Sequence, residues 1–411
     1  MTEPDTEPDV GPDVGPDVEQ ASTQNAPSTG RRQAGRERRA RERERRRFWL
    51  IVMPSIAIAL GIAVAVGFVL RGSSETTNDV GSKSRLPALA TEPALIAHVG
   101  ASSEADLILV LGRSGDSGSI LMLPASTQVE VPSLGIQTLA QVPSVGDDAL
   151  LQTTVQNLTG VNAGAPSIVD DATLLAAITP AAPFEVDLRS AVRFAADTRD
   201  AFPGGLQRLT AAEIARLMTE AQVGSEVDRL VTVQAVLEGW MKRLKNPEVA
   251  RATIAAVPIA SPISRVAGLN QTSFDTLPVD SIGTSGDERL SVRSSALPGV
   301  VKRLFPDARL GIGGKRPRLE ILNGVGTVGL AQAVARLVVP IGGDVRLSGN
   351  VPDFGVTETQ VIYYRDADRR AAEKFLKAVG VGSLRRADRA IGIADVTIIV
   401  GPDFNPKGST K

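Results

Sequence analysis

The sequence has no cysteine and only one histidine, His98, among its 411 residues. The absence of cysteine excludes disulfide bonds, thiol nucleophiles and cysteine-ligated metals. A chain that folds outside the cytoplasm without disulfides must depend on packed cores for its stability. A histidine-rich metal site or a Ser-His-Asp triad would rest on His98 alone, and we interpret His98 as a partly exposed residue. We therefore predict no metal ion and no other cofactor.

Aromatic residues are also scarce, at 3% of the chain, and the formal net charge is only -1. A near-neutral chain has no overall basic bias that would attract nucleic acid, so we expect no nucleic-acid partner. The abundance of Ala, Val, Gly and Arg is typical of a GC-rich bacterial genome.

A long apolar run is present near the start of the chain. Residues 48–70 are 23 residues without a charge, and they directly follow residues 31–47, which hold ten Arg and three Glu. About 20 apolar residues span a bilayer core, and Arg beside such a span stays on the cytoplasmic side. The junction predicts a single-pass membrane protein with a cytoplasmic N-terminus. A cleaved signal peptide is the alternative, but its apolar core would be shorter.

The segments on either side of this span have the composition of unfolded chain. Residues 1–47 combine an acidic Pro/Gly repeat with the Arg run, which predicts a disordered cytoplasmic tail. We expect the Arg run to orient the helix and to contact anionic membrane lipid; a nucleic-acid patch is the alternative. Residues 71–91 are predicted to form a polar linker, so the folded region is expected to begin near residue 92. With the N-terminus in the cytoplasm, that region is expected to be extracytoplasmic.

Residues 92–310 are predicted to form a mixed-sheet α/β domain. Apolar runs of strand length alternate with helical periodicity, and Thr210-Ala-Ala-Glu213 is a capping box that starts a helix. The predicted strands are 106–111, 119–124, 128–131 in the same sheet, 274–279 and 288–293, with a glycine-rich turn at 112–118. The predicted helices are 147–158, 171–178, 210–222 and 227–244.

A second, smaller domain is predicted at residues 318–404, after a Gly- and Lys-rich linker at 311–317 and before a short tail at 405–411. Its element order is β-α-β-β-α-β, which predicts a two-layer fold with both helices on one face of the sheet. The predicted strands are 319–322, 344–347, 359–364 and 396–400, and the predicted helices are 329–339 and 367–379. The fold class is therefore α/β (α+β) after a single transmembrane helix.

The glycines Gly324, Gly326 and Gly329 resemble a dinucleotide-binding fingerprint, with Asp344 about twenty residues further on. Two observations argue against that function. Asp344 begins the second strand instead of ending it, and the unit is too short for a doubly wound domain. We interpret the glycines as a tight turn with close helix–sheet contact.

Several motifs of the predicted domain 318–404 resemble a known family. Leu319–Gly326, the Gly349-Asn350 turn, the strand 359–364 and Asp395–Gly401 together resemble the LytR C-terminal domain. That module occurs in actinobacterial envelope proteins, often after a LytR-CpsA-Psr (LCP) domain. The resemblance implies an extracytoplasmic accessory module without established catalysis.

The upstream region is similar to the LCP catalytic domain. The landmarks are Asp106–Val110, the strand that ends at Pro124, Asn157–Val161, Phe202-Pro-Gly-Gly, Leu209-Thr-Ala-Ala-Glu and Asp228-Arg229. Active members transfer glycopolymers from a polyprenyl-pyrophosphate carrier to peptidoglycan. Their arginines clamp the pyrophosphate, and their aspartates hold a divalent cation.

The sequence departs from that family where the chemistry would take place. Active members carry Pro-Arg-Asp-Thr after the second strand, and here the stretch is Pro124-Ala-Ser-Thr127. Their Tyr-x-Arg-x-Arg run corresponds to residues 217–222, which contain no Arg, and Glu220 would repel phosphate there. Asp106 and Arg229 remain as vestigial candidates, and we predict no catalytic residue.

We therefore predict a single-pass actinobacterial envelope protein, a pseudoenzyme with a structural or regulatory role in wall assembly. Its expected partners are membrane lipid, a polyprenyl-linked or peptidoglycan-linked glycopolymer, and active LCP proteins. One alternative is a divergent LCP-type phosphotransferase that uses other basic residues, namely Arg113, Arg189, Arg193 or Arg208, although all four also fit a solvated surface. Another alternative is signalling of the state of the wall through the Arg-rich tail.

Overall fold

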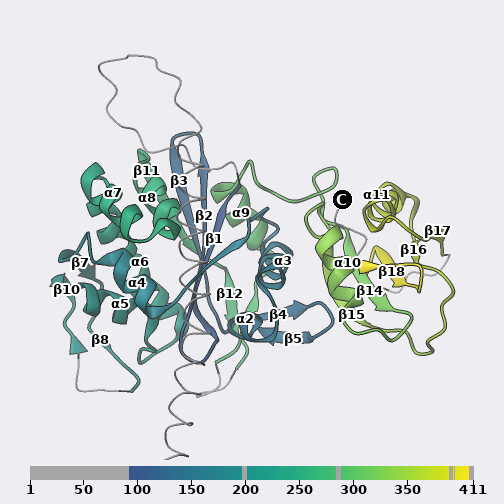
Figure 1. Cartoon of the computed structure of the whole chain (residues 1–411), viewed down its shortest axis with the longest axis horizontal. Coiled ribbons are helices and arrows are strands. Elements are labelled where there is room, and N and C mark those ends of the chain that lie inside the picture. Colours follow the sequence, from purple (N-terminus) through teal and green to yellow (C-terminus); the bar gives the residue numbers. More distant parts are fainter. Residues whose placement is uncertain (1–91, 197–200, 284–287, 388–391, 393, 407–411) are drawn as a thin grey trace, which may run out of the picture. The chain divides into compact units, whose positions relative to one another are not determined.

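A computed structural model describes residues 92–196, 201–283, 288–387, 392 and 394–406 (Figure 1). The predicted tail 1–47, the predicted span 48–70 and the predicted linker 71–91 lie outside the described residues. Within the described ranges, no helix is both long enough and apolar enough to cross a membrane. The described residues belong to one compact unit, Arg85–Lys411. They form an N-terminal lobe (residues 92–310) and a C-terminal lobe (residues 318–404), each built on its own five-stranded sheet.

The N-terminal lobe contains a mixed sheet in the order β11-β3-β2-β1-β6. The three central strands are antiparallel, and β6 and β11 add to the two sides in parallel. The strands are β1 (Ala94–Val99), β2 (Ala105–Ser114), β3 (Ser117–Leu123), β6 (Pro166–Val169) and β11 (Gln271–Thr276). The predicted mixed α/β architecture is thus present.

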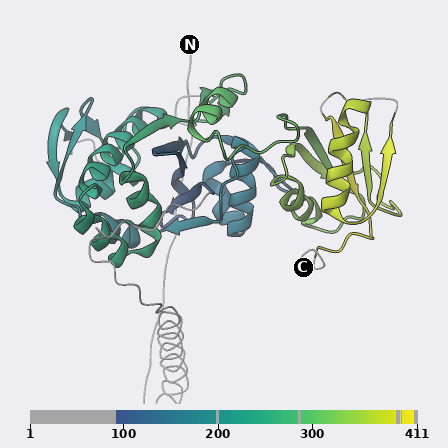
Figure 2. The same ribbon diagram turned by 90° about the horizontal axis from the view of Figure 1, so that it is seen from above.

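Both faces of this sheet are buried, which explains why its central strands are continuous apolar runs. In β2, Leu107, Leu109 and Leu111 point into one core, whereas Ile108 and Val110 point into the other. Helices α4 to α8 cover the first face, and α2, α3 and α9 cover the second (Figures 1 and 2). The helices are α2 (Val142–Val145), α3 (Asp148–Thr159), α4 (Asp171–Ile178), α5 (Ala211–Thr219), α6 (Glu226–Leu244), α7 (Pro247–Ala256), α8 (Ser261–Ala267) and α9 (Leu297–Leu304).

Local capping chemistry sets the ends of several helices. The Asp147 carboxylate accepts a hydrogen bond from the Leu150 amide at the start of α3. Gly160 ends the same helix in the left-handed region, at φ 70°. The predicted capping box of Thr210 and Glu213 starts α5. The predicted inner face of α6 is also buried: Leu230, Val233, Leu237, Trp240, Met241 and Leu244.

Two predictions about the first sheet are wrong in detail. The strand β4 (Gln128–Val131) does not extend the sheet, because it pairs with β5 (Gly135–Thr138) as a separate hairpin. The predicted turn at 112–118 is mostly strand, because β2 and β3 stay paired as far as Ser114 and Ser117. The predicted strand 288–293 is present as β13 (Leu290–Val292), which pairs with β12 (Val279–Ser281), whereas the predicted strand 274–279 covers the end of β11 and the first residue of β12. Two further hairpins pair β7 (Phe184–Leu188) with β10 (Gly205–Leu209) and β8 (Val192–Arg193) with β9 (Ala201–Phe202).

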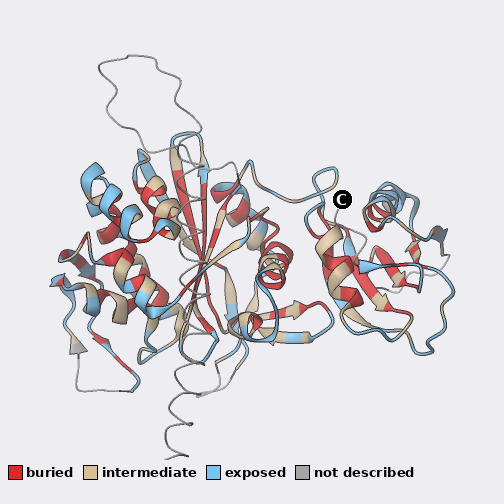
Figure 3. Cartoon of the chain, in the orientation of Figure 1, coloured by how far each residue is buried: buried red, intermediate tan, exposed pale blue. Residues whose placement is uncertain are grey.

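The C-terminal lobe contains a sheet in the order β15-β14-β18-β16-β17. Helices α10 (Leu330–Val338) and α11 (Arg369–Val379) share one apolar core with this sheet (Figure 3). The strands are β14 (Arg318–Asn323), β15 (Asp344–Asn350), β16 (Gln360–Tyr363), β17 (Ser383–Arg386) and β18 (Val396–Val400). The predicted two-layer arrangement is present, but the order β-α-β-β-α-β lacks β17. That strand is short and polar, so it carries no apolar pattern.

The two lobes are joined by polar contacts to strand β15 and to helix α10. The Asn157 side chain on α3 donates to the Val345 carbonyl at 2.9 Å and accepts from the Val345 amide at 2.8 Å. The Glu130 carboxylate on β4 accepts from the Ser348 amide at 2.9 Å and from its hydroxyl at 2.6 Å. Arg336 on α10 forms an ion pair with Asp147 at 2.5 Å.

Candidate functional site

The two vestigial candidates, Asp106 and Arg229, line one pocket of about 370 Å³ in the N-terminal lobe. The pocket lies at the end of the sheet where β2 begins and β3 ends, beside the end of α5 and the start of α6. The structure thus brings together the residues that the sequence motifs singled out. The pocket is lined by Ala105, Asp106, Ala125, Thr219, Ala221, Gln222, Gly224, Ser225, Glu226, Arg229 and Glu288.

Arg229 is buried, with 6% of its surface exposed, and its guanidinium binds backbone. One terminal nitrogen donates to the Met218 carbonyl at 2.5 Å, and the other donates to the Asp106 carbonyl. These two bonds tie the end of α5 to the start of β2. The guanidinium is therefore already engaged and does not have the free two-nitrogen fork that clamps phosphate.

Asp106 is held by the single histidine of the chain. The carboxylate lies 2.8 Å from Nδ1 of His98, and Nε2 of His98 lies 3.3 Å from the carboxylate of Asp171. His98 is only 2% exposed, so the prediction of a partly exposed histidine is wrong. His98 lies on β1, and its ring is enclosed between the side chains of Asp106 and Asp171. His98 connects the pocket to the start of α4.

The carboxylate of Glu226 occupies the turn after β3. One oxygen accepts from the Ala125 amide at 2.5 Å, and the other accepts from the Ser126 amide at 2.9 Å and from the Ser126 hydroxyl. Glu226 also lies 3.7 Å from the Arg229 guanidinium. Two convergent amides beside a guanidinium are the donors that an anion would use. Here an internal carboxylate takes that place.

The pocket as a whole is acidic. Asp106, Glu226 and Glu288 supply three carboxylates against the single guanidinium of Arg229. Glu288 accepts a hydrogen bond from the Glu226 amide at 2.8 Å. A pyrophosphate in this pocket would therefore meet more like charge than opposite charge.

The sequence placed a different carboxylate, Glu220, at the phosphate position. In the structure Glu220 forms an ion pair with Arg216 at 2.8 Å and is not among the residues that line the pocket. Sequence reasoning missed Glu226, because an acidic residue in the first turn of a helix is ordinarily explained by the helix dipole.

The four arginines of the phosphotransferase alternative do not gather at this pocket. Arg113 lies near the far end of β2, roughly 23 Å along the strand from Asp106. Arg189, Arg193 and Arg208 lie on or beside the strands β7, β8 and β10. All four are exposed, as their interpretation as solvated surface predicts.

The side chain of Asn323 holds the glycine-rich loop of the C-terminal lobe in shape. The Asn323 amide oxygen accepts from the Val325 amide at 3.1 Å and from the Gly326 amide at 3.0 Å. Its nitrogen donates to the Thr327 carbonyl at 2.8 Å. Gly326 and Gly329 have φ values of 79° and 84°, which favour glycine. The amides that would cradle a phosphate are thus used for the turn, as we interpreted from the sequence. Within the described part of the chain, no cluster of three or more His, Cys, Asp or Glu could hold a metal ion.

Residues 316–404 match the family model LytR_C, described as LytR cell envelope-related transcriptional attenuator. The C-terminal lobe is a LytR C-terminal domain. This confirms the resemblance that the motifs of the lobe predicted. A comparison with curated proteins found no match.

Three solved structures are similar to about half of the chain. A LytR-Csp2A-Psr enzyme from Actinomyces oris is 16% identical, covering 53% of this chain and 91% of that one, with a TM-score of 0.41. TagV from B. subtilis is 16% identical, covering 53% of this chain and 97% of that one, with a TM-score of 0.41. TagT from B. subtilis is 14% identical, covering 55% of this chain and 95% of that one, with a TM-score of 0.43.

Proposed function

We propose that this protein is a non-catalytic component of the cell envelope with a structural or regulatory role in glycopolymer assembly. The LytR C-terminal domain match supports a role at the envelope. The observation that carries the non-catalytic part is the carboxylate of Glu226, which fills the turn at Ala125 and Ser126. Active LCP proteins carry an Arg and an Asp in that turn, so the cation that binds phosphate is replaced by an internal anion.

The energetics support the same conclusion. Transition-state stabilisation of phosphoryl transfer depends on cations positioned at the developing charge. In this pocket the only lining guanidinium, among the described residues, is Arg229, and both of its terminal nitrogens bind carbonyl groups. Substrate phosphate would have to displace Glu226 and would still face Asp106 and Glu288.

The test is phosphate release from a polyprenyl-pyrophosphate analogue with magnesium, using the full-length chain in detergent. We expect no turnover above the protein-free background, while an active glycopolymer transferase assayed in parallel releases phosphate. Turnover that Asp106→Ala abolishes would overturn the non-catalytic assignment and would support the divergent phosphotransferase.

The location belongs to the same proposal. The apolar run 48–70 after the Arg run 31–47 supports a single membrane anchor with the N-terminus in the cytoplasm. Protease added to spheroplasts should then digest residues 92–404 and spare a tag at Met1. Protection of the C-terminal region under conditions that digest a known external protein would contradict this topology.

A further inference from the structure

A second cavity lies between the two lobes and has a volume of about 610 Å³. This is within the range of 300–1,000 Å³ that is typical of small-molecule sites, which often lie at domain interfaces. Its walls come from α3 and β4, from the start of α9, from the stretch 309–316 and from β15. It is separate from the pocket of Asp106 and Arg229, because the two share no lining residue.

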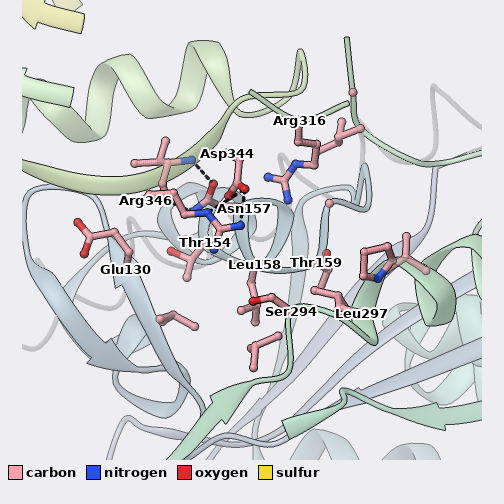
Figure 4. Close-up of a pocket in the computed structure, with 18 of the residues that line it drawn as sticks. Glu130, Thr154, Asn157, Leu158, Thr159, Ser294, Leu297, Arg316, Asp344 and Arg346 are labelled. Atoms are coloured by element: carbon pink, nitrogen blue, oxygen red, sulfur yellow. Dashed lines mark hydrogen bonds and ion pairs between the residues drawn. The ribbon is translucent and has the colours of Figure 1, made fainter. Parts of the chain in front are cut away.

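The walls are held in place by the contacts between the lobes. Asn157 lies on the cavity wall and binds both backbone groups of Val345 on the opposite side. Figure 4 shows Asn157 beside Asp344 and Arg346, with the Arg316 guanidinium next to Asp344. A cavity with fixed walls loses little entropy when a ligand binds.

Of the three arginines that line the cavity, only Arg346 has an ion pair among the described residues, and Arg309 and Arg316 have none. Asp344 accepts from Arg346 at 2.6 Å, and Glu130 accepts from Ser348. Among the described residues, Arg316 has no ion pair, and its guanidinium donates a hydrogen bond to the Gly343 carbonyl at 2.9 Å. Its Nε is buried without a described partner. Burial lowers the pKa of the Arg316 guanidinium below its ordinary value, since charge is costly to remove from water.

The rest of the wall combines hydroxyl groups with aliphatic surface. Ser291 and Ser294 supply hydroxyls, and Leu158, Leu297 and Pro298 supply aliphatic surface. Hydroxyls match the polar edge of a sugar ring, and aliphatic groups match its C–H face. Arg316 has a buried Nε without a described partner and could therefore donate to an anion in the cavity.

We propose that the cavity between the lobes binds an anionic saccharide, with Arg316 contacting its phosphate or carboxylate group. This rests on the proposed role in glycopolymer assembly, because such polymers carry sugars with these groups. Arg309, which also lines the cavity and is exposed, adds a second positive charge at the edge. The ligand would contact both lobes at once.

The test is calorimetric titration of the full-length chain in detergent with defined ligands. The ligands are N-acetylglucosamine 1-phosphate, glucuronic acid, neutral N-acetylglucosamine and inorganic phosphate. We expect an anionic sugar to bind at least tenfold more tightly than the neutral sugar and than inorganic phosphate. Binding of only one anionic sugar supports the proposal and identifies the anion.

Three variants locate the site. Arg316→Gln should weaken binding of the anionic sugar at least tenfold. Ser294→Glu should do the same, because it adds a negative charge to the exposed edge of the cavity without touching a core. Ser295→Glu is the matched control, since Ser295 is exposed and does not line the cavity, and it should bind as the wild type does.

The proposal is overturned if neither anionic sugar binds at millimolar concentration, if Ser294→Glu binds as tightly as Ser295→Glu, or if inorganic phosphate binds as well as the sugar phosphate. The readout is binding and not turnover. A negative result therefore leaves the phosphate-release test of the proposed function unaffected, and the two can fail separately.

Discussion

Glu226 lies at the first position of α6 and caps a turn one hundred residues earlier in the chain. Its two oxygens receive three hydrogen bonds, and its side chain is 13% exposed. A buried amide that loses such an acceptor costs the free energy of its desolvation. This carboxylate therefore stabilises the fold as well as filling the pocket.

Replacement of Glu226 by Gln should destabilise the N-terminal lobe by about 1–3 kcal/mol. The NH2 group of Gln would face the backbone N–H of Ala125 or Ser126, and two donors cannot form a hydrogen bond. Urea unfolding of the full-length chain measures the change. Glu238→Gln on the same helix is the control, since Glu238 is exposed, and it should stay within about 0.5 kcal/mol of wild type. Equal stability of the two variants would contradict a capping role for Glu226.

Glu130 gives a prediction about pH. Burial raises the pKa of Glu130 above its ordinary value of 4.5, and the hydrogen bonds from Ser348 oppose that shift only in part. An acid with a raised pKa in the folded state stabilises the fold below pH 4.5, and this contribution is lost as the pH rises through the folded pKa. The ionised form is thus the less favourable one for the fold.

We expect Glu130→Gln to remove this dependence. Both hydrogen bonds from Ser348 reach the same oxygen of Glu130, so the Gln carbonyl can keep them without a buried charge. The stability of the wild type relative to the variant should fall between pH 4 and the raised pKa, as followed by thermal unfolding in a pH series. A difference that does not change with pH would show that Glu130 titrates as an exposed residue does.

At the scale of elements, the loop between β14 and α10 depends on one side chain. Asn323 is 8% exposed and satisfies the amides of Val325 and Gly326 together with the carbonyl of Thr327. The loop thus obtains its shape from an amide side chain at the end of a strand, which is a common way to build a tight turn. The glycines supply the left-handed conformations that this turn requires.

Replacement of Asn323 by Ala should therefore destabilise the C-terminal lobe by about 1–3 kcal/mol. Residues 316–404 expressed alone and unfolded in urea would report the loss, provided that the fragment unfolds cooperatively. The exposed Asn270 is a control in the full-length chain, where Asn270→Ala should have almost no effect. An Asn323→Ala variant as stable as wild type would mean that the glycines alone define the turn.

Several elements could be predicted from the sequence because local signals decide them. Asp147 and Gly160 mark the two ends of α3, and the apolar spacing of α6 fixed its buried face. The strand β17 (SLRR) could not be predicted, since an exposed edge strand has no apolar alternation. The sequence of β4 predicts a strand but does not specify its partner, so its pairing with β5 in a separate hairpin could not be predicted.

The site was predictable only in part for a related reason. Asp106 and Arg229 were found through motifs, and the structure places both in one pocket. Glu226 was missed because its partners, Ala125 and Ser126, are distant in sequence. Arg316 was predicted only as part of a Gly- and Lys-rich linker, and its burial arises from contact between lobes that no local pattern reports.

At the scale of the whole molecule, polar side chains help to couple the described lobes. Asn157→Ala would remove both hydrogen bonds to Val345 and leave a buried amide and carbonyl without side-chain partners. We expect calorimetric unfolding of the full-length chain to separate into two transitions in this variant. Gln152→Ala on the same helix removes a bond to Ala163 inside the N-terminal lobe, so it should lower the stability of that lobe without separating the transitions. A single unshifted transition in Asn157→Ala would mean that other contacts couple the lobes.

The hydrogen bonds from Asn157 to β15 also affect the tendency of the chain to self-associate. A strand at the edge of a sheet presents unpaired backbone groups, which can recruit a strand from another chain and start aggregation. Asn157 occupies both backbone groups of Val345, and Glu130 occupies the Ser348 amide further along the same edge. The opposite edge, β17, is four residues long and carries Arg385 and Arg386, charges that discourage a flat neighbour. Wherever copies of this chain meet, the sheet of the C-terminal lobe would thus be protected at both edges against growing into a fibre.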